Sequence, residues 1–268
     1  MEQRQAQSMA AVIAIANTKG GSGKTSTAVN LSFAMAITHR KVLLVDVDPQ
    51  SSATVALGFE RADDSHSLAG VLISGNPMAS IVLKYNRGLF DLIPANEDLT
   101  AVQVALYSEG DGKLRLRKAL SALRDLYDFI FIDCPASPGL ITQNALCAAD
   151  SMIIPTPCDY FAIDSLSQVT ALFERLKSSG EASLKLLGVL RTMYDQHRAL
   201  SMSISRELEQ QFGPLLFHTV IPYTERVNEA SASGRPLLLY DKSSLASRSY
   251  LELAGEIIGK LSKGPVTI

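Results

Sequence analysis

A glycine-rich run near the N-terminus has the residue types and the spacing of a loop that binds phosphate groups. The run lies between a predicted strand and a predicted helix, which is the context that such a loop requires. Glycines let the backbone fold tightly and turn its N–H groups toward phosphate oxygens, and the following helix adds the positive end of its dipole. Lys24 is expected to reach the β- and γ-phosphates of a nucleotide, and the Thr25 hydroxyl to coordinate Mg²⁺. The predicted nucleotide-binding residues are Lys19, Gly20, Gly21, Ser22, Gly23, Lys24, Thr25 and Ser26.

Three carboxylates are expected at the same edge of the sheet as this loop, because each ends or follows a predicted strand. Asp46 and Asp48 are two residues apart, so alternation along the strand sends them to one face. They lie at the carboxyl end of the strand, where open α/β sheets bind ligands. Asp133 closes a run of four apolar residues, the Walker B form in which the acid holds Mg²⁺, often through water. Acidic strand ends without a catalytic role are the alternative.

The elements that position these residues follow from short apolar runs that alternate with longer helical patterns. Most of the strands are continuous apolar runs, which is typical of strands covered on both faces. The chain is therefore predicted to be an α/β protein with a doubly wound, mainly parallel sheet and helices on both faces. The segment Glu60–Gly88 is the least regular and is expected to be a surface loop with a short helix. The expected strands are Ala11–Asn17, Val42–Asp46, Leu89–Pro94, Phe129–Asp133, Ser151–Pro155, Leu186–Arg191 and Phe217–Ile221, and the expected helices are Lys24–Thr38, Lys113–Leu126, Gly139–Ala149, Ile163–Ser178, Ala199–Phe212 and Ser244–Leu261.

Composition limits the classes of protein that the chain could be. Hydrophobic residues make up 47% of the 268 residues, enough for a sizeable core, and the net charge of −2 gives no overall basic field. Any contact with nucleic acid must therefore come from a local patch. Residues 1–9 lack the apolar run of a signal peptide, and no stretch reaches the ~18 apolar residues of a membrane span. Together with three cysteines that lack C-x-x-C spacing, these features predict a cytoplasmic protein with a flexible leader over residues 1–9 and a single domain over residues 10–268.

The phosphate loop departs from the general pattern in a way that resembles one family. Thr18 stands where a glycine is usual, and the extra Lys19 gives the form K-G-G-x-G-K-T/S of the ParA/MinD ATPases. The run from Asp46 to Gln50 is similar to the D-x-D-P-Q motif of that family, and the residues after Asp133 are similar to its D-x-P-P-S motif with Ala136 for the second proline. The segment Glu225–Asp241 resembles a stretch that is more specific to ParA than to MinD. The resemblance extends from Ala11 to about Leu261.

This resemblance implies a P-loop NTPase fold, ATP and Mg²⁺ as cofactors, and slow intrinsic ATP hydrolysis. It implies a sandwich homodimer in which Lys19 reaches the nucleotide of the partner subunit, while Asp48 positions or activates the attacking water and Asp46 lies near the Mg²⁺ shell. Two loops after distal strands, with Met193 and Pro222, are expected to hold the adenine; ordinary turns are the alternative. The implied catalytic residues are Lys19, Lys24 and Asp48, and the implied metal residues are Thr25, Asp46 and Asp133.

ParA dimers bind double-stranded DNA non-specifically, so the resemblance also predicts a nucleoid-associated protein. Non-specific binding needs cations that neutralise phosphates and no reading of the bases. Two departures bear on this expectation, because His197 and Tyr223 stand where the family usually has arginine. The C-terminal segment is a poor membrane-surface helix, so no membrane contact is expected. The candidate DNA-binding residues are Arg191, Arg198, Arg226 and Arg235, each with a solvated surface role as the alternative.

Three functions remain open at this point. The first is partition of chromosome or plasmid DNA, with hydrolysis stimulated by a ParB-like partner. The second is a positioning ATPase of the same chemistry whose cargo is protein, such as a chemoreceptor cluster or a microcompartment. The third is a metabolic ligase or reductase of the same superfamily; for a reductase of the nitrogenase type, the position of Cys134 does not resemble the required cysteine spacing.

Overall fold

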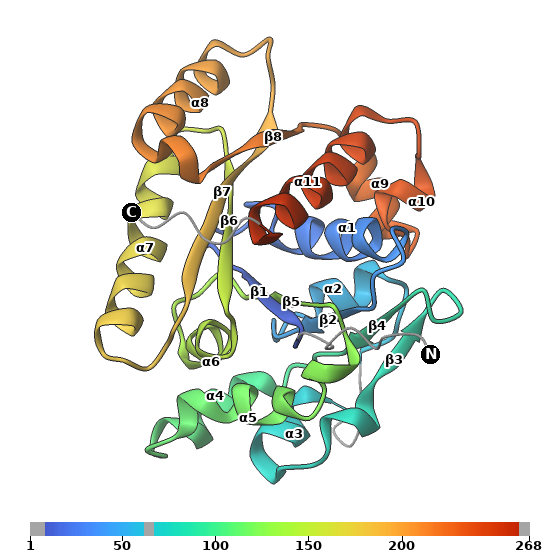
Figure 1. Cartoon of the computed structure of the whole chain (residues 1–268), viewed down its shortest axis with the longest axis vertical. Helices are drawn as coiled ribbons and strands as arrows, with labels where there is room; N and C mark the ends of the chain where they lie inside the picture. The colour runs from blue at the N-terminus through green and yellow to red at the C-terminus, as the bar shows by residue number, and fades with distance from the viewer. Residues whose placement is uncertain (1–8, 62–66, 263–268) are drawn as a thin grey trace, which may run out of the picture.

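The computed structural model describes residues 9–61 and 67–262, and these residues build one eight-stranded sheet. The order of the strands is β3-β4-β2-β5-β1-β6-β7-β8, and all neighbouring pairs are parallel except β3 and β4 (Figure 1). The predicted doubly wound, mainly parallel α/β fold is therefore confirmed. The strands are β1 (Ala11–Ile15), β2 (Val42–Asp46), β3 (Leu83–Tyr85), β4 (Phe90–Ile93), β5 (Phe129–Asp133), β6 (Ser151–Pro157), β7 (Lys185–Tyr194) and β8 (Leu216–Pro222).

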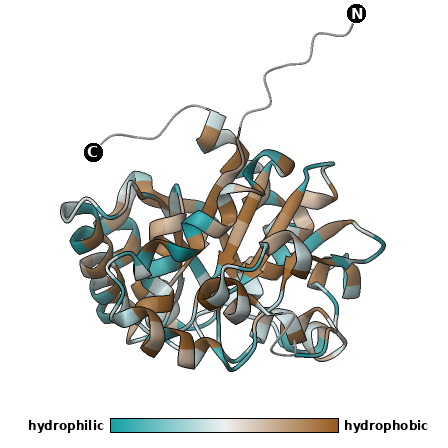
Figure 2. Ribbon diagram, turned by 90° about the horizontal axis from the view of Figure 1, so that it is seen from below, coloured by the Kyte–Doolittle hydropathy of each residue, from teal (hydrophilic) through white to brown (hydrophobic). Residues whose placement is uncertain are grey.

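Helices cover both faces of the sheet, so the central strands are buried on both sides (Figures 1 and 2). In β1, Ile13 and Ile15 pack into one apolar cluster while Val12 and Ala14 pack into the other. This two-residue alternation explains why the strands are apolar without interruption. One face carries α1 (Lys24–Ala36), α2 (Ser52–Ala56), α9 (Arg226–Ala232), α10 (Leu237–Tyr240) and α11 (Leu245–Ser262), and the other carries α3 (Leu68–Ser74), α4 (Leu99–Tyr107), α5 (Arg115–Ser121), α6 (Leu140–Ala148), α7 (Ala162–Ser178) and α8 (Ala199–Phe212).

Two expected segments differ in the structure. The helix expected over Lys113–Leu126 is divided into η3 (Gly112–Leu114), α5 and η4 (Arg124–Leu126). The Asn144 side chain accepts the backbone N–H of Leu116, 3.1 Å away, so a side chain of α6 caps the start of α5 where the longer helix would have continued. The irregular segment after Glu60 contains α3, η2 (Met78–Ile81) and β3, which pairs antiparallel with β4 as a hairpin.

The leader expected over residues 1–9 falls outside the described residues except for Met9, which is exposed. Within residues 9–61 and 67–262, no helix has both the length and the apolar character needed to cross a bilayer.

Candidate nucleotide-binding site

The parallel register brings the predicted site residues to one end of the sheet. The Cα atom of Asp46 in β2 lies opposite that of Asp133 in β5, and Asp133 in turn lies opposite Ile15 at the end of β1. Both aspartates share the strand parity of Phe129 and Phe131, whose side chains pack on the face that α1 covers. The glycine-rich loop joins β1 to α1, so the loop and both carboxylates meet at the carboxyl edge of the sheet, as predicted.

The loop has the backbone that its glycines were expected to allow. Gly21 and Gly23 adopt φ angles of 68° and 87°, and Gly23 directly precedes the first residue of α1. Side chains with a Cβ atom are strained in this left-handed region, so glycine is the residue that fits both positions. Lys24 is 6% exposed and donates from Nζ to the carbonyl oxygen of Lys19, 2.9 Å away. The ammonium group thus lies across the mouth of the loop.

Two side chains hold the loop, Asn17 just beyond the end of β1 and Thr192 in β7, and the sequence analysis assigned no role to either. The Asn17 amide donates to the carbonyl oxygen of Pro155 in β6 (2.7 Å) and accepts the N–H of Lys19 (3.0 Å). Thr192 in β7 donates from its hydroxyl to the carbonyl oxygen of Ser22, 2.9 Å away. A Cβ atom at Gly23 would lie 3.5 Å from the Thr192 side chain, which shows how closely β7 approaches the loop. The position of Asn17 and Thr192 at strand ends was the available signal.

The two buried aspartates have different surroundings. Among the described residues, neither carboxylate oxygen of Asp133 has a hydrogen-bond partner, although the residue is fully buried. Burial raises the pKa of Asp133 well above its ordinary value and Asp46 raises it further, while the Thr25 hydroxyl and the Lys24 ammonium lower it. Burial also raises the pKa of Asp46, to about 6. A bare buried carboxylate beside a threonine hydroxyl is the donor set that Mg²⁺ prefers, so these residues fit a magnesium nucleotide.

Asp46 is less available to an ion than the sequence suggested. Its Oδ1 accepts the N–H of Asp48 at 3.1 Å, and its Oδ2 accepts both the N–H and the hydroxyl of Thr54 at 2.8 Å each. Of the three predicted metal residues, Asp133 is therefore the carboxylate whose oxygens remain free for an ion. The carboxylate of Asp46 is mainly committed to the chain itself.

Replacing Asp133 with asparagine is expected to raise the melting temperature of the ligand-free protein. An acid whose pKa is raised in the fold contributes stability below its unfolded pKa, near 4, and loses that contribution as the pH rises through the folded pKa. At about pH 8 the ionised form opposes folding, and Asp133→Asn removes that cost. Each kcal/mol gained moves the melting temperature of a chain of this size by about 2–4 °C.

Differential scanning fluorimetry with and without Mg²⁺ and ADP measures both sides of this prediction. Asp133→Asn is expected to lose the extra stabilisation that Mg²⁺ adds to the nucleotide. The control is Asp150→Asn, because Asp150 already pairs with Arg124 and accepts the N–H of Val12 at 2.9 Å. A lower melting temperature for ligand-free Asp133→Asn at pH 8 would contradict the interpretation.

The ammonium of Lys19 points to the start of α7. It pairs with the carboxylate of Asp159 and lies 5.6 Å from the ring centroid of Phe161. Phe161 and its neighbour Tyr160 are 60% and 75% exposed. Lys19 thus lies at an accessible, partly aromatic edge of the site, while Lys24 occupies the mouth of the loop. The sequence reasoning did not single out Asp159, although it follows the carboxyl end of β6.

The residues predicted to hold the base lie next to one another at the ends of β7 and β8. Tyr194 is in register with Pro222, and the N–H of Tyr223 donates to the carbonyl oxygen of Tyr194 at 2.9 Å. Met193 is 40% exposed and has a φ angle of 52°, a left-handed conformation that is uncommon outside glycine and concentrated at functional sites. Because Thr192 contacts the phosphate loop, Met193 and Pro222 lie within the same region of the molecule.

The four candidate arginines have different surroundings. Arg191 is committed to the fold, since its guanidinium donates to the Ser205 hydroxyl at 3.0 Å and to the carbonyl oxygen of Phe217 at 3.2 Å. It is therefore withdrawn as a candidate for contact with a phosphate. The remaining three are exposed: Arg198 lies 3.4 Å from an Asp195 oxygen, Arg226 pairs with Glu229 at 2.8 Å, and Arg235 forms no ion pair within the described residues.

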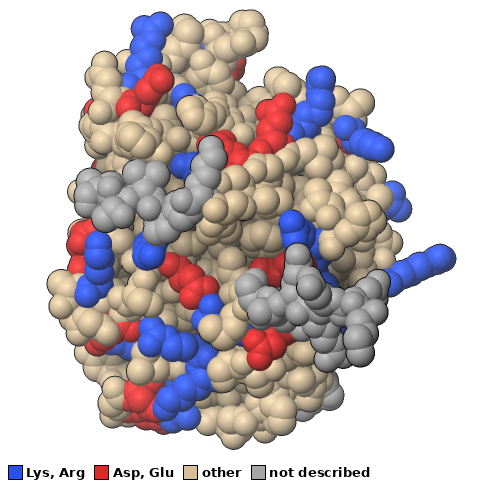
Figure 3. All heavy atoms as spheres, viewed as in Figure 1, with Lys and Arg blue, Asp and Glu red and all other residues tan. Residues whose placement is uncertain are grey.

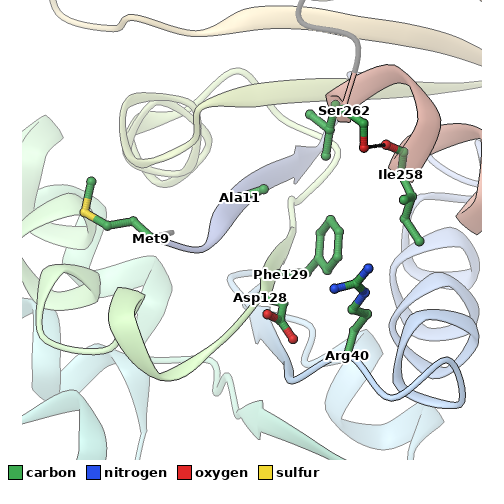
Figure 4. A pocket seen from close by; sticks show the side chains of 8 residues that line it. Met9, Ala11, Arg40, Asp128, Phe129, Ile258 and Ser262 are labelled. Atoms are coloured by element: carbon green, nitrogen blue, oxygen red, sulfur yellow. Dashed lines mark hydrogen bonds between the residues drawn. The ribbon is translucent and has the colours of Figure 1, made fainter. Parts of the chain in front are cut away.

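One cavity lies away from this edge. It lies at the amino-terminal ends of β1 and β5, opposite the phosphate loop, and its volume is about 220 Å³. Figure 4 shows the side chains that line it. Arg40, Asp128 and Ser262 contribute its polar side chains. Its lining residues are Met9, Ala11, Arg40, Asp128, Phe129, Ile258, Leu261 and Ser262, none of which belongs to the predicted site.

Comparison with known proteins gives the same result as the geometry. Residues 10–186 match a family model described as an AAA domain. The chromosome partitioning protein ParA of Caulobacter vibrioides is 39% identical over 251 residues, which cover 93% of this chain and 94% of that protein. The sporulation initiation inhibitor protein Soj of Bacillus subtilis is 39% identical over 249 residues, with 93% and 98% covered. A solved structure of cobyrinic acid a,c-diamide synthase from Mycobacterium smegmatis, with bound ADP and magnesium, superposes with a TM-score of 0.83 at 29% identity, covering 97% of this chain and 100% of that one. With the loop, the paired acids and relatives of nearly equal length in agreement, the chain belongs to the ParA family of P-loop ATPases and is an ATP hydrolase.

Proposed function

We propose that this ATPase partitions chromosome or plasmid DNA: it forms an ATP-dependent sandwich dimer, binds double-stranded DNA without sequence preference, and is stimulated to hydrolyse ATP by a ParB-like partner. The similarity to ParA and Soj along nearly the full length of the chain carries this proposal. The cobyrinic acid a,c-diamide synthase covers as much of the chain at lower identity, which favours partition over ligase chemistry. The protein acts on the nucleoid in the cytoplasm.

The nucleotide is ATP with Mg²⁺, and each part of the site has a separate task. Backbone N–H groups near Gly21 and the start of α1 hold the phosphates, and Lys24 neutralises the β- and γ-phosphates. Thr25 and Asp133 would hold the ion, which would supply positive charge to stabilise the transferring phosphate. Asp48, half-buried at the end of β2, orients the attacking water. Met193 and Pro222 contact the adenine.

Lys19 serves the second subunit in this proposal. Its ammonium lies beside Asp159 and Phe161, whereas Lys24 lies over the loop of its own chain. A cation at an accessible edge can reach a nucleotide bound across an interface. Such a charge stabilises the transition state only when two copies are assembled, so hydrolysis is coupled to the dimer. The exposed rings of Tyr160 and Phe161 are suited to burial in that interface.

DNA contact is assigned to the exposed arginines near α9 and α10. On the face in Figure 3, Lys and Arg side chains are interspersed with Asp and Glu, so the attraction must be local. Arg226 pairs with Glu229 at 2.8 Å, and its Nε lies 3.9 Å from an Asp241 oxygen. Arg235 is exposed and forms no ion pair with any described residue. Arg235 is therefore the stronger candidate for contact with a phosphate.

Arg235→Glu is expected to weaken ATP-dependent DNA binding more than Arg226→Glu does, with ATP affinity unchanged in both. Each lost phosphate contact lowers the slope of log K against log salt concentration by about 1. Fluorescence anisotropy of a labelled duplex, measured with MgATP and with MgADP over a series of salt concentrations, gives affinity and slope. Arg175→Glu, the same change of charge on the exposed end of α7, is the control.

Two results would count against this assignment. Unchanged affinity and slope for Arg235→Glu would remove it from the DNA surface. Equal binding of wild type to duplex with MgATP, with MgADP and without nucleotide would contradict the nucleotide-controlled binding on which partition depends.

A further inference from the structure

The Thr54 hydroxyl is buried at the carboxyl edge of the sheet, and its two neighbours fix which hydrogen bond it donates and which it accepts. Thr54 is fully buried near the start of α2. Its Oγ1 lies 3.2 Å from the backbone nitrogen of Ala95 and 2.8 Å from Oδ2 of Asp46. The amide can only donate, so Oγ1 accepts from Ala95 and its single proton is left for Asp46. The hydroxyl is therefore a fixed donor to that carboxylate.

Asp46 transmits this restraint to Asp48. The N–H of Thr54 also donates to Oδ2 of Asp46, at 2.8 Å, while Oδ1 accepts the N–H of Asp48 at 3.1 Å. The Asp46 carboxylate thus links the first turn of α2 to the backbone of Asp48, whose own carboxylate orients the attacking water. The Asp48 side chain is held in turn, because its Oδ1 accepts the N–H of Gln50 at 2.9 Å.

The end of β4 closes the same loop from the other side. Ser51 is buried with a φ angle of 57°, a left-handed conformation that costs free energy in a residue with a side chain. Its N–H donates to the carbonyl oxygen of Asp48 at 2.8 Å, and its hydroxyl donates to that of Ala95 at 3.0 Å. Ala95 therefore binds both Ser51 and Thr54, and the segment between Asp48 and Thr54 is held at both ends.

We propose that Thr54 is a positioning residue for ATP hydrolysis: it fixes the carboxylate of Asp46, which in turn holds Asp48 where it orients the attacking water. The phosphate loop, by contrast, is anchored by Asn17 and Thr192, so binding of the nucleotide does not depend on Thr54. Without the hydroxyl, the Asp46 carboxylate accepts hydrogen bonds only from backbone N–H groups. The position of Asp48 is then less tightly restrained. Displacements of about 1 Å at such distances cost up to about 100-fold in rate.

The proposal rests on the role of Asp48 and is tested with Thr54→Val, which keeps the shape and removes the hydroxyl. The expected result is a fall in kcat of about 10- to 100-fold, the range typical of groups that orient a reacting residue or its metal ligand. ATP affinity, measured by calorimetry in EDTA so that no ion contributes, is expected to stay within about twofold, because the phosphate loop is intact. Thr54→Ser, which retains the donor, is expected to restore kcat.

The controls separate positioning from simple support of the fold. Thr170→Val removes a hydroxyl whose hydrogen bonds go to carbonyl oxygens of its own helix α7, those of Leu166 and Ser167, and is expected to leave kcat unchanged. Thr54→Ala is measured as well, in case the valine variant does not fold. Parallel loss of melting temperature, ATP affinity and kcat without rescue by serine would overturn the proposal, as would an unchanged kcat in a folded variant.

Asp48→Ala measured beside these variants distinguishes the possible failures. A low kcat for Asp48→Ala with a normal kcat for Thr54→Val and Thr54→Ala removes Thr54 alone. A normal kcat for Asp48→Ala removes both the role of Asp48 and the inference that depends on it. Neither result touches DNA binding, which is measured separately.

Discussion

Lys24→Ala is expected to abolish ATP binding while leaving the protein folded. The Lys24 ammonium lies at the mouth of the loop, 2.9 Å from the Lys19 carbonyl oxygen, where phosphate oxygens would replace that acceptor. Hydrogen bonds to charged groups contribute about 1.5–3 kcal/mol each, so loss of two phosphate contacts costs about 3–6 kcal/mol. Since 1.4 kcal/mol is tenfold, affinity is expected to fall by at least about 100-fold. Burial lowers the pKa of Lys24, which means that the fold disfavours its charged form. Removing this side chain is therefore not expected to unfold the ligand-free protein.

Calorimetry with ATP and Mg²⁺ measures this effect, and the thermal melt of each variant verifies the fold. Lys41→Ala is the matched control, because Lys41 is exposed just before the amino end of β2, away from the site. Its affinity for ATP is expected to equal that of the wild type. Micromolar or tighter binding by a folded Lys24→Ala protein would show that the phosphates lie elsewhere.

The sheet and its functional edge could be predicted because their signals are local. Each core strand is a short run of apolar residues, and the strand–helix alternation leaves few alternatives to a doubly wound sheet. The loop from Lys19 to Ser26 and the acid after Phe129–Ile132 carry their chemistry in adjacent residues. Parallel pairing brings the ends of β2 and β5 to the same edge of the sheet. Asp46 and Asp133 could therefore be predicted to lie close together without knowledge of the exact register.

The parts that could not be predicted depend on contacts between distant segments. The helix expected over Lys113–Leu126 becomes α-helical only at Arg115, where the side chain of Asn144, from α6, accepts the N–H of Leu116. The sequence predicts Arg191 as a candidate for DNA contact, but its guanidinium donates to Ser205 of α8 and to the backbone of β8. Such partners lie 14 to 28 residues away in sequence, and no local pattern encodes them.

The division of roles between Asp46 and Asp133 was also invisible in the sequence. Both are acids at strand ends, and the sequence predicts both as metal residues. The structure distinguishes them because Thr54 of α2, eight residues beyond Asp46, donates a hydrogen bond from its hydroxyl to Oδ2 of Asp46. Asp133 forms no hydrogen bond among the described residues, and only the Thr25 hydroxyl and the Lys24 ammonium partly offset its burial, so it is the acid that gains most from a cation. The distinction depends on which acid is already hydrogen-bonded within the chain.

Asp48→Ala is expected to bind ATP normally, to hydrolyse it slowly and to accumulate as an ATP-bound dimer. A group that orients or activates water contributes about 10²–10⁴-fold to the rate, so kcat is expected to fall by at least about 100-fold. Asp48 is half-buried at the end of β2, and its carboxylate accepts the N–H of Gln50. Because this contact lies outside the phosphate loop, the loop is expected to stay intact in the variant. Since hydrolysis is what dissolves the proposed dimer, blocking it leaves the γ-phosphate in place and the dimer populated.

Size-exclusion chromatography with light scattering, in MgATP and in MgADP, measures this population directly. Only MgATP is expected to shift Asp48→Ala to twice the 28.9 kDa of the chain. Glu174→Ala removes an exposed carboxylate from α7 and is expected to behave as the wild type. Adding Lys19→Ala to Asp48→Ala is expected to abolish the dimer without abolishing ATP binding, because Lys19 acts across the interface while Lys24 binds within the chain. If Asp48→Ala bound ATP and remained monomeric at saturating nucleotide, the γ-phosphate would not control assembly, and a switch built on Lys19 could not drive partition.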